Sequence, residues 1–176
     1  MIKRALLNGT TDGKIMTCLK TAGWYDGRNI DITEITSFYT SGGIALSDRA
    51  KQFLREYYGI AQHWYFNERD DSPLNRSADI LFSLYPDTGE SRCNEDYFDE
   101  EQLEDRKTVE AFAGEPVVYI GDIGYYYPAF VYIGVSGKIY TAHDYDDIIR
   151  CYDSVPEMLV YDFQNHVEEW HSVSME

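Results

Sequence analysis

Hydrophobic residues recur at helical spacing along the first third of the chain. Between residues 12 and 22 the apolar positions lie three or four apart, residues 10–12 can cap the helix, and Gly23 ends it. The same kind of pattern predicts a second helix over residues 33–40 and a third that begins at Ser47–Asp48 and ends before Gly59. The first third is therefore expected to be helical.

Short runs of aromatic and β-branched residues replace this pattern after about residue 60, and such runs are typical of strands. Strands are predicted at His63–Phe66, Ile80–Tyr85, Val117–Ile120, Ala129–Val135 and Lys138–Ala142, with another edge strand over residues 146–152. Ser136–Gly137 would join two of these strands in a tight hairpin.

Two helices are expected among and after these strands. One covers residues 96–113, and the other begins at a capping box formed by Ser154 and Glu157, with Met158, Tyr161, Phe163 and Val167 following it. No repeat or linker divides the chain, so the pattern predicts a single α+β domain over residues 1–176.

Composition adds a strong charge imbalance. The 176 residues contain 15 Lys and Arg against 31 Asp and Glu, a net charge of −16, while 15% aromatic residues are typical of a folded chain. Residues 1–55 carry a net charge of +3 and residues 56–176 a net charge of −19. This charge disfavours nucleic acid and anionic membranes as partners and favours a basic protein.

The cysteines and apolar runs indicate the cellular location that we expect for the protein. Cys18, Cys93 and Cys151 are far apart and fit neither a disulfide framework nor a zinc site, so no metal or cofactor is expected. The N-terminal apolar run is shorter than the apolar segment of roughly 7–15 residues that a signal peptide needs. Residues 129–135 are far short of the roughly 20 that a membrane span needs. We therefore expect a cytoplasmic protein.

An acidic run without a basic residue precedes and enters the predicted helix over residues 96–113. Asp96, Glu100 and Glu104 share one helix face, where like charges repel mildly. The run is either a solvated helix face near the positive end of the helix dipole or a surface that meets a cationic partner. The candidate partner-binding residues in it are Glu95, Asp96, Asp99, Glu100, Glu101 and Glu104.

Two further clusters are candidates for partner binding. Tyr125, Tyr126 and Tyr127 could anchor an interface or simply cover a sheet. Asp144, Asp146 and Asp147 could suggest a hard cation, but the segment lacks the glycine turn and the distal Glu of a calcium loop, and the plainer interpretation is a loop between strands.

Motifs of catalysis are missing from the sequence. The four histidines form no zinc-protease pattern, and no nucleophile turn or glycine-rich phosphate loop occurs. Paired carboxylates exist in so acidic a chain, but nothing singles out one pair for glycoside hydrolysis. The sequence therefore favours a protein that is not an enzyme.

Several segments resemble the third subfamily of the SUKH immunity proteins. The most specific is Trp24-x-x-Gly27-Arg28, which follows the first predicted helix. The resemblance spans roughly residues 12–168, and the other segments that carry it are Phe53–Gly59, Gly114–Gly121 and Ile133–Tyr140.

The resemblance implies a fold and a function. The fold would be a mixed, mostly antiparallel sheet with flanking helices. The function would be that of a bacterial cytoplasmic immunity protein that neutralises a cognate polymorphic toxin, often a nuclease. No catalytic residue carries over; Trp24 would be a core plug, Gly27 a turn residue and Arg28 a paired anchor. The alternative is a regulatory or scaffold protein-binding domain of the same fold without a toxin partner.

Overall fold

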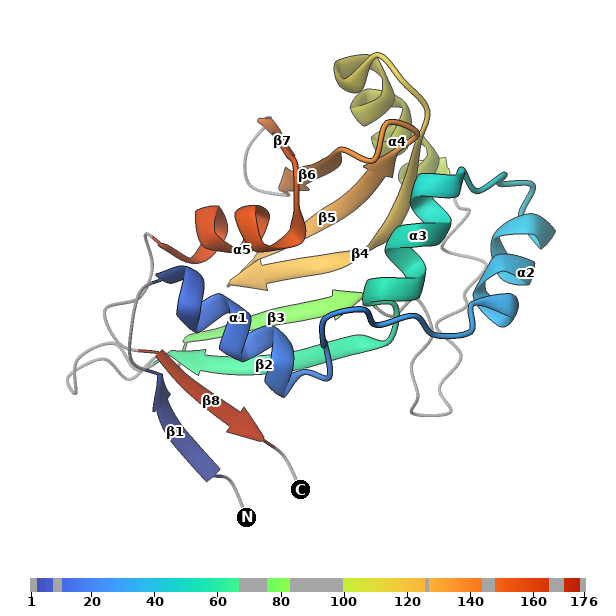
Figure 1. Ribbon diagram of the computed structural model, residues 1–176. Helices are drawn as coiled ribbons and strands as arrows, with labels where there is room; N and C mark the ends of the chain where they lie inside the picture. Colours follow the sequence, from blue (N-terminus) through green and yellow to red (C-terminus); the bar gives the residue numbers. More distant parts are fainter. Residues whose placement is uncertain are drawn as a thin grey trace.

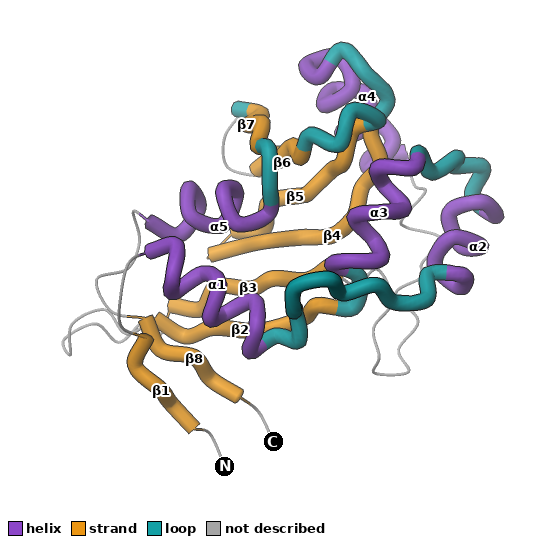
Figure 2. The backbone as a smooth tube through the Cα atoms, in the orientation of Figure 1, coloured by secondary structure: helices purple, strands orange, loops and turns teal. Residues whose placement is uncertain are grey.

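The structure is a computed structural model that describes residues 3–7, 11–66, 76–82, 100–125, 127–143, 148–164 and 170–174. Helices lie against a twisted antiparallel sheet, which is an α+β fold (Figures 1 and 2). The helices are α1 (Thr11–Thr21), α2 (Thr33–Ser41), α3 (Asp48–Tyr57), α4 (Glu100–Ala113) and α5 (Val155–Gln164). The strands are β1 (Lys3–Leu7), β2 (Ile60–Phe66), β3 (Arg76–Phe82), β4 (Val117–Tyr125), β5 (Tyr127–Gly134), β6 (Ile139–His143), β7 (Ile149–Tyr152) and β8 (Trp170–Ser174).

The strands form one sheet in the order β1-β8-β2-β3-β4-β5-β6-β7. Every strand pair among the described residues is antiparallel. From β2 to β7 each strand pairs with its neighbour in the chain, whereas β1 and β8 bring the two ends of the chain together at one edge (Figure 1). The expected α+β fold is confirmed; where a mixed, mostly antiparallel sheet was expected, the described strands form antiparallel pairs throughout.

The two faces of the sheet have different cores. Helices α1, α3 and α5 lie over one face (Figure 1), and Val131 and Ile133 of β5 point into the apolar core beneath them. Tyr132 alternates to the other face, where it packs with Val109 of α4 and Tyr140 of β6. The period of two along β5 therefore separates a large core, to which α1, α2, α3 and α5 all contribute, from a small one under α4.

Capping residues read from the sequence occur where they were predicted. Ser47 precedes α3, and its hydroxyl accepts a 3.1 Å hydrogen bond from the backbone N–H of Ala50. At α5, the Ser154 hydroxyl accepts from the Glu157 N–H, and the Glu157 carboxylate accepts from the N–H of Asp153 at 2.7 Å. Both helices begin at these residues because the side chains satisfy N–H groups that have no partner within the helix.

Other boundaries differ from the sequence prediction. The β1–β8 pair was not predicted, and α5 is described to Gln164, with Val167 outside the described residues. Strand β4 extends past Ile120 to Tyr125, through a bulge between Tyr119 and Gly121. The glycines in this extension have low strand propensity, but hydrogen bonding to both β3 and β5 overrides that preference.

Candidate functional site

Trp24 connects the end of α1 to the last turn of α3. Its indole N–H donates a 3.2 Å hydrogen bond to the Glu56 carboxylate. Its ring lies parallel to that of Tyr57, with 6.5 Å between the ring centroids. The half-buried Trp24 packs against the large core rather than lying wholly inside it.

Arg28 binds the backbone at the C-terminal end of α3. Its guanidinium donates to the carbonyl of Glu56 at 2.7 Å and to the carbonyl of Tyr58 at 2.8 Å. Carbonyls at the end of a helix lack partners within the helix and carry partial negative charge, so a cation there is favoured. Burial lowers the pKa of Arg28, but arginine pKa values are so high that the side chain keeps its charge.

Gly27 gives the connection its turn. Its φ is +76°, in the left-handed region that costs an ordinary residue roughly 1–2 kcal/mol, and an added β-carbon would meet no neighbouring heavy atom within 4 Å. The requirement for glycine here is therefore one of backbone conformation. Together, Trp24, Gly27 and Arg28 fasten the segment after α1 to the end of α3.

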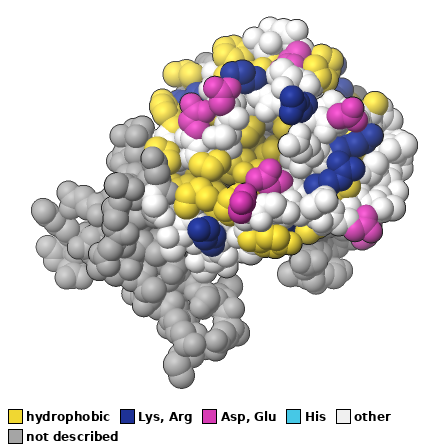
Figure 3. Space-filling view, in the orientation of Figure 1, with side chains coloured by type: hydrophobic (Ala, Val, Ile, Leu, Met, Phe, Trp, Pro, Cys, Tyr) yellow, Lys and Arg dark blue, Asp and Glu magenta, His cyan; other side chains and the backbone are white. Residues whose placement is uncertain are grey.

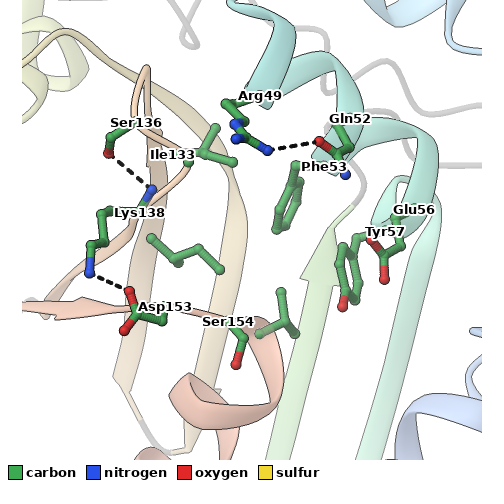
Figure 4. A pocket seen from close by; sticks show the side chains of 13 residues that line it. Arg49, Gln52, Phe53, Glu56, Tyr57, Ile133, Ser136, Lys138, Asp153 and Ser154 are labelled. Carbon is green, nitrogen blue, oxygen red and sulfur yellow. Dashed lines mark hydrogen bonds and ion pairs between the residues drawn. The ribbon is translucent and has the colours of Figure 1, made fainter.

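A groove lies on the face of the sheet that α1, α3 and α5 cover, beside the contact between Trp24 and α3. It has a cavity volume of about 390 Å³ and lies between α3, the β5–β6 turn and the start of α5 (Figure 4). Phe53, Ile133 and Val155 contribute apolar surface to it. Hydrophobic side chains gather in the middle of this face, with charged side chains around them (Figure 3).

Four charged side chains of the described residues line the groove. Lys138 and Asp153 form an ion pair, and the hydrogen bond and charge of Asp153 raise the pKa of Lys138. Glu56 accepts the hydrogen bond from Trp24, so one carboxylate belongs both to the motif and to the groove wall. Arg49 donates to the neutral Gln52 side chain at 3.3 Å. The four charges that the described residues contribute to the groove cancel, whereas the whole chain has a net charge of −16.

The structure describes only some of the acidic and tyrosine residues that the sequence singled out. Glu100, Glu101 and Glu104 lie on α4, where Glu104 is exposed, while Tyr125 ends β4 and Tyr127 begins β5. The remaining candidates lie outside the described residues; they are Glu95, Asp96, Asp99, Tyr126, Asp144, Asp146 and Asp147.

The described candidates fall on two separate parts of the molecule. Helix α4 leads into the first residue of β4, whereas Tyr125 ends that strand, about 26 Å away along nine residues. Figure 1 accordingly shows α4 far from the β4–β5 tip. His143, which precedes the aspartates at 144–147, pairs with Ala129 near that tip. The structure therefore places the acidic helix and the tyrosine tip at different ends of the sheet.

Neither a metal centre nor a membrane span stands out in the described part of the chain. No three His, Cys, Asp or Glu side chains there are grouped to hold a metal ion. None of the helices described is long and apolar enough to cross a bilayer.

Comparison with known proteins settles the relationship that the motif suggested. The family model described as SUKH-3 immunity protein matches residues 11–155. The chain belongs to the SUKH-3 immunity protein family. The match covers Trp24, Gly27 and Arg28 and all the residues that line the groove, up to Val155.

The family match and the structure do not have the same bounds. The match begins with α1 and ends as α5 begins, so β1 and β8 lie outside it. It also ends before residue 168, where the resemblance was expected to end. A search of curated proteins and a search of solved structures found no significant match.

The groove is the feature that sequence reasoning missed. Phe53–Gly59 and Ile133–Tyr140 were both noted as segments that resemble the family, but nothing in either pattern indicates that they meet across a groove. Ser136 and Gly137 were expected only to form a hairpin turn, and they do so while also lining the groove.

Proposed function

We propose that this protein is a bacterial immunity protein that binds one cognate toxin in the cytoplasm and neutralises it without catalysis. The observation that carries the proposal is the family match over residues 11–155. The inhibitor would act stoichiometrically, by covering the toxin's site or by holding the toxin in an inactive state.

The net charge supports a basic toxin as the partner. A chain of net charge −16 attracts a basic protein, and such steering raises association rates by roughly 10–10³-fold. A nuclease fits this description, because an enzyme that binds a polyanion presents basic side chains. The same charge disfavours direct binding to nucleic acid or to an anionic membrane.

Most of the net negative charge belongs to residues outside the described ranges. The described ranges contain 17 acidic and 13 basic residues, and the rest of the chain contains 14 acidic and 2 basic ones. We retain the acidic and tyrosine candidates as proposed toxin contacts. Because α4 and the β4–β5 tip lie apart, we propose them as two contact regions rather than one patch.

Co-expression tests the proposal directly. Candidate toxins from neighbouring genes are expressed in bacteria with and without the protein, and survival is scored. We expect protection and a stable one-to-one complex of the purified proteins. Toxicity unchanged by the protein, together with no complex, would contradict the immunity function and favour the regulatory or scaffold alternative.

A charge variant tests the electrostatic part separately. Glu100→Gln with Glu104→Gln removes two charges from α4, and Asp26→Asn with Glu34→Gln removes two exposed charges from the first third as a control. We expect the α4 variant alone to associate more slowly with the toxin and to show a weaker salt dependence. Equal rates and salt slopes for the two variants would remove α4 from the interface.

A further inference from the structure

The groove between α3, the β5–β6 turn and the start of α5 is suited to bind a protein segment. Resting on the proposed function, we infer that it is the docking site for a short segment of the toxin that carries an apolar side chain beside a carboxylate. This contact is distinct from α4 and from the β4–β5 tip, and it explains how an acidic inhibitor would hold its partner at short range.

The apolar part of the groove would receive the apolar side chain. Phe53 is 6% exposed, Ile133 3% and Val155 1%, yet all three line an open cavity of about 390 Å³. This volume falls within the range of roughly 300–1,000 Å³ that binding pockets occupy. A partner side chain could be largely removed from water there without any change in the core.

The groove walls are held in place before any partner binds. Ser136, in the β5–β6 turn, donates from its backbone N–H and its hydroxyl to the Glu115 carboxylate, at 2.8 and 2.5 Å. Opposite, the aliphatic stem of Arg49 runs close to Gly137, where an added β-carbon would lie 3.3 Å from Arg49 Cδ. Preformed walls reduce the entropy lost on binding.

The charges at the groove select a carboxylate. Lys138 is paired with Asp153, and Glu56 accepts a hydrogen bond from Trp24. Arg49 donates a side-chain hydrogen bond to the neutral Gln52, and no carboxylate of the described residues forms an ion pair with it. A guanidinium binds carboxylates through two parallel hydrogen bonds, and arginine is enriched in interface cores.

The local charge makes this compatible with a basic toxin. The four charged groups that the described residues contribute to the groove sum to zero, so these groups leave room for a carboxylate in a chain of net charge −16. Long-range attraction would bring the basic toxin to the acidic body, and one acidic segment of that toxin would then occupy the groove.

A charge reversal at Arg49 tests the inference. The Arg49→Glu variant is compared with Arg55→Glu, which makes the same charge change at an exposed position of the same helix that does not line the groove. The probe is the purified toxin used in the survival assay, and its dissociation constant is measured by calorimetry. We expect Arg49→Glu to weaken binding at least tenfold and Arg55→Glu to change it less than threefold, with both variants folded by circular dichroism.

The outcomes separate the two proposals. If the wild-type protein fails to bind the toxin, the proposed function fails and the groove inference falls with it. If the wild type binds and the two variants bind alike, only the groove inference is overturned. A self-association that Arg49→Glu abolishes while toxin binding persists would assign the groove to a second copy, which also overturns it.

A photo-crosslinker at Gln52 tests the chemistry of the occupant. Gln52 is exposed and lines the groove, so benzoylphenylalanine at this position reaches whatever docks there. We expect the crosslinked toxin peptide to contain an Asp or Glu next to an apolar residue. A peptide without an acidic residue, or no crosslink in a complex that still forms, would overturn the inference.

Discussion

Arg28 is the residue whose removal is expected to have the clearest effect on stability. Its guanidinium holds two backbone carbonyls at the end of α3, those of Glu56 and Tyr58, at 2.7 and 2.8 Å. Hydrogen bonds to a charged group contribute about 1.5–3 kcal/mol each. Because Arg28 is only half-buried and water can replace part of the contact, we expect Arg28→Ala to lower the free energy of unfolding by about 2–3 kcal/mol.

Urea denaturation measures this loss. With a slope of about 2 kcal/mol per M, typical of a domain of this size, the unfolding midpoint should fall by about 1–1.5 M. Arg28→Lys should lose about half as much, because an ammonium cannot span both carbonyls as a planar guanidinium does. Arg55→Ala, which removes an exposed cation from α3, the helix whose end Arg28 binds, should change the midpoint by less than about 0.2 M. The reasoning is refuted if Arg28→Ala shifts the midpoint no more than Arg55→Ala.

Three further substitutions probe single features. Burial alone would raise the pKa of Glu115, but hydrogen bonds from Ser136 and Tyr140 outweigh it and lower the pKa below 4.5. Glu115 therefore stabilises the fold above its unfolded pKa, and this contribution is lost as the pH falls through the folded pKa. Glu115→Gln should be less stable than the wild type at pH 7 and should lose less stability between pH 5 and 3. Thermal melts measure this, and parallel curves of melting temperature against pH for the two proteins would contradict it. Tyr39→Phe removes a 2.6 Å hydrogen bond from a fully buried hydroxyl to the Tyr119 carbonyl and should lower the free energy of unfolding by about 1–2 kcal/mol. Urea unfolding measures this, and an unchanged midpoint would contradict it. Gly27→Ala should cost about 1 kcal/mol through its positive φ alone, and Gly27→Asn clearly less; equal losses would argue for a packing role instead.

The candidate site shows where sequence reasoning stopped. The Trp24-x-x-Gly27-Arg28 pattern predicted the family, and the family match covers it. The contacts of Arg28 could not be predicted, because its partners are backbone carbonyls about 30 positions further along the chain and carbonyls leave no signature in side-chain identity. An acidic partner such as Asp or Glu would have been the expected choice from residue types alone.

For the tyrosines and acidic residues, the sequence identified candidates but did not predict how far apart they lie. The sequence names Glu104, on a predicted helix, and Tyr125 as candidates, but only the sheet reveals that α4 and Tyr125 lie at opposite ends of β4. Distance along the chain does not predict distance in space once strands fold back on each other. The tip formed by Tyr125 and Tyr127 exists because β4 and β5 pair in register there.

Local chemistry determined which elements form. Capping at Ser47 and Ser154, the ends marked by glycines and the aromatic and β-branched run along residues 129–135 are local features of the chain. The sequence by itself therefore predicted the helices α1, α2, α3 and α4, the start of α5 and most of the central strands. The net charge of −16 is likewise a property of composition alone, and it indicates the kind of partner before any fold is known.

The tertiary structure alone decided what those elements build. The β1–β8 pair joins strands from opposite ends of the chain, and no periodicity within either strand shows that the other exists. The groove likewise needs Arg49, Gly137 and Val155 to meet across three elements. Gly134 shows the physical reason most clearly: a side chain there would occupy the space of the Glu115 carboxylate, a requirement set by packing between distant residues and therefore invisible in the sequence.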